Sequence, residues 1–337
     1  MATDPIQLAR DIIGAAEKGD FQIAPTTHAA AFQSKTPELA VVLRSSRVGL
    51  AAADYEDKDR EANEAQAEFK RMFDRSNLTM FLTSICIVLV LATGVLDPPN
   101  KRIFLVTFGL LSLFGGSIAA YYLNVLKQGN LLDNRMSSRA RAEAARLAYF
   151  MSIANAPLVT NLGNDFDLIK LEYFRRFQLD VQINYFEGAA KRNRMDARKT
   201  LKLSSIAVAG AGSITAAAGF AGGFSNPKFA AIATLGTFFA GLSTFAATRE
   251  AVYHNQRNAE RFARTREALI EINKQIDDVR AAVLIDGQKP LLDFIGAVHE
   301  QLLAEHKQWL GLGTEAETAV TKLQDSLDKS LGRLPTK

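Results

Sequence analysis

The sequence has little of what most catalytic and metal-binding sites need. Its 337 residues include one cysteine and four histidines. The cysteine, Cys86, cannot form an internal disulfide and has no ionisable neighbour to activate its thiol. His299 and His306 lie seven residues apart, whereas zinc sites on one helix favour a spacing of four. We therefore predict no catalytic, cofactor-binding or metal-binding residues, and we expect the protein not to be an enzyme.

Charge is missing from four long stretches of the chain. These uncharged stretches are residues 78–96, 103–123, 203–224 and 229–248. A transmembrane helix needs about 20 apolar residues to cross about 30 Å of hydrocarbon, so each stretch is long enough to span a bilayer. The alternative is a pair of core hairpins in a soluble protein, although four uncharged runs are rare in soluble chains. Without acids or bases, the stretches lack the usual signature of an ion-coupled transporter.

The third stretch, SIAVAGAGSITAAAGFAGGF at 205–224, also has the composition of a glycine-rich phosphate loop. Gly210 and Gly212 begin like a dinucleotide-binding fingerprint, but Thr215 occupies the position of its third glycine. No Lys-Ser or Lys-Thr pair follows at the spacing of a phosphate loop. We therefore interpret this stretch as a membrane span.

Two short turns, at 97–102 and 225–228, connect the four stretches in two pairs. Both turns contain Pro and Asn. The predicted fold is an all-α membrane protein, in which two transmembrane helical hairpins are joined to long cytoplasmic amphipathic or coiled-coil-like helices. RAEAAR at 141–146 and NAERFAR at 258–264 follow the two hairpins and indicate an approximate duplication. The predicted divisions are a short helix and loop at 1–36, a first repeat at 37–155, a second repeat at 156–285 and a helical tail at 286–337.

The N-terminal residues have acids among their apolar residues and do not resemble a secretory leader. We therefore expect both termini on the cytoplasmic side of a plasma membrane that is crossed several times. The basic residues at 191–202 are expected to meet anionic lipid headgroups. The net charge of +4 is small and no aromatic residues interleave with the basic ones, so we expect no nucleic-acid partner.

Two apolar seams mark helices outside the spans. The seam at Leu269, Ile272, Ile276, Val279 and Val283 has heptad spacing and fits either a coiled coil or an amphipathic helix packed on its neighbours. The bulkier seam in the middle of the chain is expected to pack as core; it comprises Phe166, Ile169, Tyr173, Phe177 and Val181. We expect a loop at 19–36, a helix break at 286–290, and helices at 291–310 and 314–331.

Two patterns in the second hairpin indicate candidate functional faces. Small residues recur every fourth position in the third span: Ser205, Ala209, Ser213, Ala217 and Ala221. Such a face allows close helix packing, either within one bundle or between copies in a homo-oligomer. In the fourth span, steps of three and four connect candidate pore-lining residues: Thr234, Thr237, Gly241, Thr244 and Thr248. These hydroxyls could face water, or could bond carbonyl groups of their own helix.

Three segments give the chain a resemblance to a known family. They are PELAVVLRSSRVGLAAADYEDKDREANEAQAEFKR before the first span, RAEAARLAYF with its echo NAERFARTREAL after the hairpins, and EHKQWL at 305–310. Together with the paired spans they resemble the SLATT superfamily of bacterial two-transmembrane effector domains, here in a tandem four-span arrangement. The resemblance implies an inner-membrane effector that forms pores or disrupts the membrane in anti-phage defence.

This chain departs from the defence systems in which such domains occur, because we find no nucleotide-binding domain fused to it. The resemblance then implies a trigger that comes from a nucleotide-sensing or nucleotide-signalling partner, or that binds the cytoplasmic helices. Two other functions stay open on the sequence. One is a non-conducting scaffold whose cytoplasmic helices recruit partners, and the other is a small-ion channel.

Overall fold

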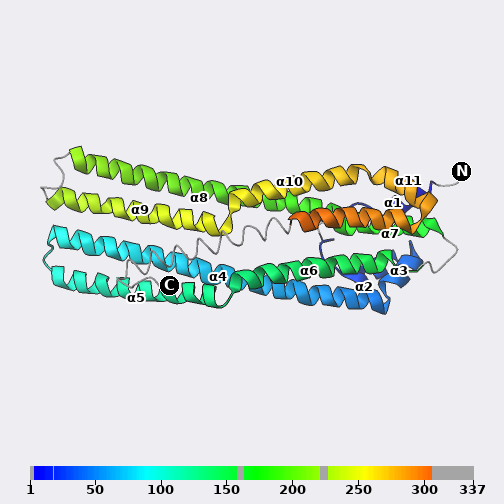
Figure 1. The fold of residues 1–337 in the computed structure, drawn as a ribbon, viewed down its shortest axis with the longest axis horizontal. Coiled ribbons are helices and arrows are strands. Elements are labelled where there is room, and N and C mark those ends of the chain that lie inside the picture. The colour runs from blue at the N-terminus through cyan, green and yellow to red at the C-terminus, as the bar shows by residue number, and fades with distance from the viewer. Residues whose placement is uncertain (1–3, 18, 158–162, 221–226, 306–337) are drawn as a thin grey trace. The chain divides into compact units, whose positions relative to one another are not determined.

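A computed structural model describes residues 4–17, 19–157, 163–220 and 227–305 (Figure 1). The chain is about 89% helical, and no strand occurs in these ranges. The N-terminal helices are α1 (Pro5–Ile13), α2 (Pro25–Phe32) and α3 (Pro37–Leu43). The longer helices are α4 (Ser46–Leu96), α5 (Lys101–Gln128), α6 (Leu131–Ala154), α7 (Asn164–Phe174), α8 (Val181–Phe220), α9 (Pro227–Tyr253), α10 (Asn255–Lys274) and α11 (Ile276–Asp286). A π-helical segment, η1 (Arg175–Asp180), joins α7 to α8, and a further helix covers 288–305.

Contacts divide the chain into two compact units. The first, here called the core unit, comprises Met1–Glu64, Arg135–Arg192 and Asn258–Leu310. The second, here called the apolar unit, comprises Ala65–Asn134, Asn193–Arg257 and Gly311–Lys337, of which the last segment lies outside the described residues. The units group segments by contact, whereas the divisions predicted from the sequence follow the order of the chain.

The core unit is built on the two apolar seams expected from the sequence. All five residues of the middle seam are buried, which confirms that this seam packs as core. In the other seam, Leu269, Ile276 and Val283 are buried in the same cluster and two further members pack against it. Because α10 ends at Lys274 and α11 begins at Ile276, the seam belongs to two amphipathic helices packed on their neighbours.

Local sequence explains where several helices begin and end. Pro5, Pro25 and Pro37 are each the first residue of a helix, where the missing N–H leaves no hydrogen bond unmade. Gly287 ends α11 with a positive φ of 68°, so the break expected at 286–290 is confirmed. The next helix begins at 288, and Pro290 lies in its first turn, where proline is tolerated.

The loop expected at 19–36 is wrong in part, because α2 occupies its middle. This helix has eight residues and buries Ala29 and Phe32. Eight residues are too few to display an amphipathic period in the sequence, and packing of Phe32 against the core supplies the stability that periodicity could not reveal. The predicted helix at 314–331 and the turn at 225–228 lie outside the described residues, apart from the two residues that begin α9.

The helices of the apolar unit pack in the order α5, α4, α9 and α8. The Ser76 hydroxyl of α4 donates to the Ala119 carbonyl of α5 at 3.4 Å. The ring of Phe81 on α4 lies against Phe238 and Phe245 on α9, with centroids 5.9 and 5.3 Å apart. Gly210 of α8 lies so close to α9 that an added Cβ would stand 2.7 Å from the Phe239 ring.

Three helices in the described residues are long and apolar enough to span a membrane. Their bounds are Ser46–Leu96, Lys101–Lys127 and Asn164–Phe220, and only 11% of the most apolar window of each is buried within the chain. A soluble monomer rarely exposes so much contiguous apolar surface, which disfavours the alternative of core hairpins. The fourth uncharged stretch lies in α9, and its role as a span stays a prediction.

Candidate functional site

The small-residue face of α8 points away from the described helices. Ser205, Ala209, Ser213 and Ala217 are exposed, and Ala221 lies outside the described residues. The contact of α8 with α9 uses other residues, since Ala207 and Ala218 are buried and Gly210 meets Phe239. Within the described residues, the predicted face is therefore not the one that packs α8 on its neighbours.

The outward face of α5 differs sharply in side-chain size. Its exposed large hydrophobic residues are Ile103, Phe104, Val106, Leu110, Leu111, Leu113, Phe114, Ile118 and Tyr121. Large apolar side chains suit contact with lipid tails, whereas small ones permit another helix or a ligand to approach the backbone closely. Helices α5 and α8 thus present chemically different surfaces, as their sequences indicate.

The threonine stripe of α9 is not uniformly exposed. Thr237 and Thr244 are exposed, Thr234 and Gly241 are half-buried, and Thr248 is buried. The Thr237 hydroxyl donates to the Thr234 carbonyl, and the Thr244 hydroxyl donates to the Ala240 carbonyl at 3.0 Å. Because both hydroxyls are satisfied by their own helix, neither requires water. Gly241 faces α4, where an added Cβ would lie 3.3 Å from Ser84.

A buried arginine is the main feature that sequence reasoning missed. Arg146 of α6 is 1% exposed and has no carboxylate among its hydrogen-bond partners in the described residues. Its Nε donates to the Gln178 amide oxygen at 2.6 Å, and its terminal nitrogens donate to the Tyr55 hydroxyl and to the carbonyls of Phe21 and Phe177 at 3.2–3.3 Å. The guanidinium also lies 4.7 Å from the centre of the Phe21 ring, so aromatic faces add to its stabilisation.

Arg146 and its hydrogen-bond partners are here called the polar centre, and the segment η1 supplies part of it. A π-helical turn is wider than an α-turn, and such turns occur often at functional sites. Here it places Gln178 and the Phe177 carbonyl against Arg146, and it directs Arg176 to the carboxylate of Asp20, with 2.7 Å between Nε and Oδ2. Its other arginine, Arg175, donates to the Gly14 carbonyl just beyond α1, at 3.0 Å. The segment therefore joins α1 and α6 to the core through charged hydrogen bonds.

A chain of three polar side chains crosses the same core. Nδ1 of His28 lies 2.7 Å from the Tyr173 hydroxyl, which lies 2.8 Å from the Tyr149 hydroxyl. Burial raises the pKa of both tyrosines. Burial lowers the pKa of the His28 imidazole to about 4, with Asp20 raising it and Arg176 lowering it further. The imidazole is therefore neutral at physiological pH.

The depressed pKa of His28 predicts an acid-sensitive core unit. Its ordinary value is 6.5, so the unfolded chain takes up a proton first, and stability is lost as pH falls from about 6.5 towards 4. Between pH 7 and pH 5 the loss should be about 2 kcal/mol. Thermal unfolding of the purified protein at the two pH values measures it. His28→Gln should reduce this difference, and an unchanged pH dependence in that variant would contradict the assignment.

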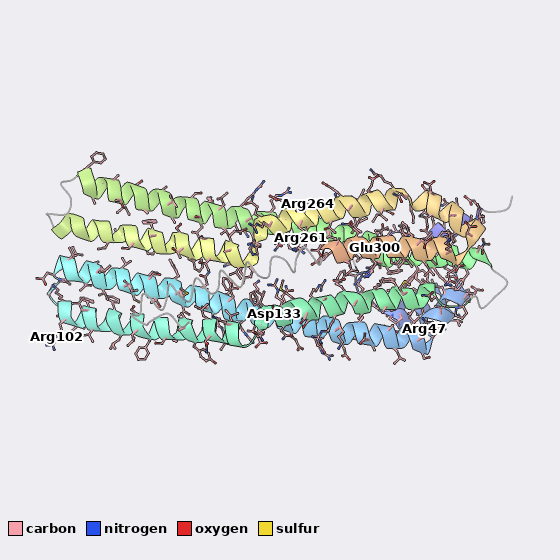
Figure 2. All side chains as sticks on the ribbon, in the orientation of Figure 1. Arg47, Arg102, Asp133, Arg261, Arg264 and Glu300 are labelled. Atoms are coloured by element: carbon pink, nitrogen blue, oxygen red, sulfur yellow. The ribbon has the colours of Figure 1, made fainter. Side chains whose placement is uncertain are left out.

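Other buried charges of the core unit are paired. Glu172 of α7 accepts hydrogen bonds from Arg280 at 2.6 Å and from Arg175 at 2.7 Å. Arg261 of α10 pairs with Glu305 at 3.0 Å, and burial raises the pKa of the Glu305 carboxyl while Arg261 opposes the rise. Arg261 is labelled in Figure 2. The Glu172 pairs join α7 to α11 and to η1, and the Arg261 pair joins α10 to the helix at 288–305.

No group of three or more potential metal ligands occurs within the described ranges. Cys86 is a free, half-buried cysteine on α4. His299 is part-buried, and burial lowers the pKa of its imidazole, whereas His306 lies outside the described residues.

No protein-family model matches the chain, and no match was found among curated proteins or solved structures.

Proposed function

We propose that the protein is a membrane-embedded effector that assembles from several copies and opens a pore or disrupts the membrane in bacterial anti-phage defence. The observation that carries the proposal is the exposed small-residue face of α8, formed by Ser205, Ala209, Ser213 and Ala217 on a helix able to span a bilayer. Lipid gives helices no hydrophobic reason to associate, so a face that admits close packing favours a specific contact. A second copy of this chain is the simplest partner.

The same proposal places two transmembrane hairpins in the bacterial inner membrane, α4 with α5 and α8 with α9. Both termini and the core unit then lie in the cytoplasm. There, the core unit could receive a signal from a nucleotide-sensing or nucleotide-signalling partner. The resemblance to the SLATT superfamily supports this arrangement, and the core unit's many buried polar contacts suit a rigid receiving element. We propose no catalytic role.

A non-conducting membrane scaffold is the second candidate. One observation favours it: Thr237 and Thr244 of α9 bond carbonyl groups of their own helix, so the proposed pore-lining stripe needs no water. A scaffold would still use the α8 face for assembly, but its expression would leave the membrane potential intact. A small-ion channel would conduct without a trigger and would depolarise cells at any expression level.

Controlled expression in a bacterial host, followed with a membrane-potential dye, tests the proposal. With the proposed signalling partner also supplied, the wild type should depolarise and arrest the cells. Ala209→Leu should weaken association of copies about 5- to 150-fold, because overpacking a close contact costs about 1–3 kcal/mol, and should therefore restore the potential. Val106→Leu on the exposed face of α5 adds bulk without touching the proposed contact, so it should behave as the wild type.

The two candidates give different results in this experiment. An intact potential at full expression of the wild type, with the proposed partner also supplied, would favour the scaffold. Equal depolarisation by wild type and Ala209→Leu would show that the α8 face does not mediate assembly.

A further inference from the structure

A straight line of exposed residues runs along the outer side of α8. Its members follow one another at steps of four and three, which keeps them on one helical face: Arg194, Arg198, Leu201, Ser205, Val208 and Gly212. Leu201 and Val208 are 67% and 60% exposed. A Cβ added at Gly212 would meet no atom within 4 Å, so the line ends in a flat, open part of the helix.

The charged end of this line has no counter-charge in the described protein. Arg194, Arg198 and the adjacent Lys202 are exposed, and no ion pair joins them to a carboxylate in the described ranges. The nearest acid along the helix, Asp196, pairs instead with Lys199 at 3.1 Å. Three cations therefore stand at the point where the uncharged stretch of α8 begins, which is where lipid headgroups meet a membrane helix.

We propose that this line binds an anionic phospholipid. Arg194, Arg198 and Lys202 hold the phosphate, since guanidinium groups match phosphate oxygens in pairs and an ammonium adds a point charge. One acyl chain lies along Leu201, Val208 and Gly212. These positions extend about 16 Å along the helix, close to the thickness of one hydrocarbon leaflet of about 15 Å.

Ser205 belongs both to this line and to the small-residue face of α8. Beyond Ser205, Ala209 and Ser213 turn towards a neighbouring side of the helix, so the lipid and a second copy of the chain would lie next to each other and meet at Ser205. The inference requires only that α8 lies in a membrane.

Native mass spectrometry of the purified full-length protein tests the site. The protein is loaded with phosphatidylglycerol or phosphatidylcholine, and retained lipid is counted. Replacing Arg194, Arg198 and Lys202 together with glutamine should lower phosphatidylglycerol retention at least tenfold, because each basic residue near an anionic headgroup contributes about fivefold. Retention of phosphatidylcholine should not change. Arg194→Lys with Arg198→Lys should keep most of the binding, which also controls for misfolding.

The matched control replaces Lys70, Arg71 and Arg75 of α4, which are also exposed basic residues just before an uncharged stretch. This control should retain phosphatidylglycerol as the wild type does, and equal loss in both triple variants would overturn the site in favour of diffuse surface charge.

Gly212→Leu should weaken lipid binding with the cations intact, because the leucine side chain would cover the surface on which the acyl chain lies. Unchanged lipid binding in Gly212→Leu, with inorganic phosphate as an effective competitor, would overturn the proposal in favour of a simple phosphate site. A triple variant that alters only the number of copies would overturn it in favour of a protein interface.

Discussion

Arg146→Met should destabilise the core unit by about 3 kcal/mol or more, which is a large part of the stability of a typical domain. Methionine matches much of the volume of arginine but donates no hydrogen bond. The Gln178 amide oxygen, the Tyr55 hydroxyl and the carbonyls of two further residues would each lose a donor. A buried acceptor left unsatisfied costs about 1–3 kcal/mol, so the losses together exceed what repacking can recover. Chemical denaturation in detergent, followed by circular dichroism, measures the change.

Arg60→Met is the matched control, because Arg60 also lies on a long helix of the core unit but its side chain is 64% exposed. Its ion pair with Asp57, at 2.8 Å, is solvated and should contribute less than about 1 kcal/mol. The control should therefore unfold close to the wild type. A loss below about 1 kcal/mol for Arg146→Met would show that the polar centre does not hold the unit together.

Hydropathy alone predicts the helical class and the candidate spans, because an uncharged stretch of about 20 residues has few other stable forms. Three helices long and apolar enough to cross a membrane bear this out. The seam from Phe166 to Val181 was also readable as core, and its repeated steps of four suit the wide turn of η1. The helix α2 was not readable, because its eight residues are ordered by Phe32 packing on distant segments.

The candidate sites, too, could be predicted from the sequence only in part. Spacing predicts that Ser205, Ala209, Ser213 and Ala217 share a face, but only the packing of Gly210 on Phe239 shows that this face points outward. The polar centre around Arg146 was harder still to predict from the sequence. Arg146 sits in a charged stretch typical of a solvated helix, and its partners lie 31 to 125 residues away in the chain. The one available signal was Tyr173, a phenol within an apolar seam, because a buried hydroxyl requires a partner.

We propose that two hairpins cross the membrane with the core unit in the cytoplasm. Cysteine labelling in intact cells tests it directly, since Cys86→Ser removes the only native thiol. Single cysteines are then placed at Asn100 in the first turn, at Asn226 in the turn predicted at 225–228, and at Arg60 in the core unit. Arg60 is exposed in the folded chain, so a lack of reaction there would reflect the membrane barrier.

An impermeant thiol reagent should label the cysteines at Asn100 and Asn226 in intact cells, and should label the cysteine at Arg60 only after the membrane is opened. That pattern requires both turns outside and the core unit inside, as two complete hairpins demand. Labelling at Arg60 with protection at both turns would reverse the orientation. Labelling at Asn100 without labelling at Asn226, in intact cells, would contradict the second hairpin and with it the proposed assembly through α8.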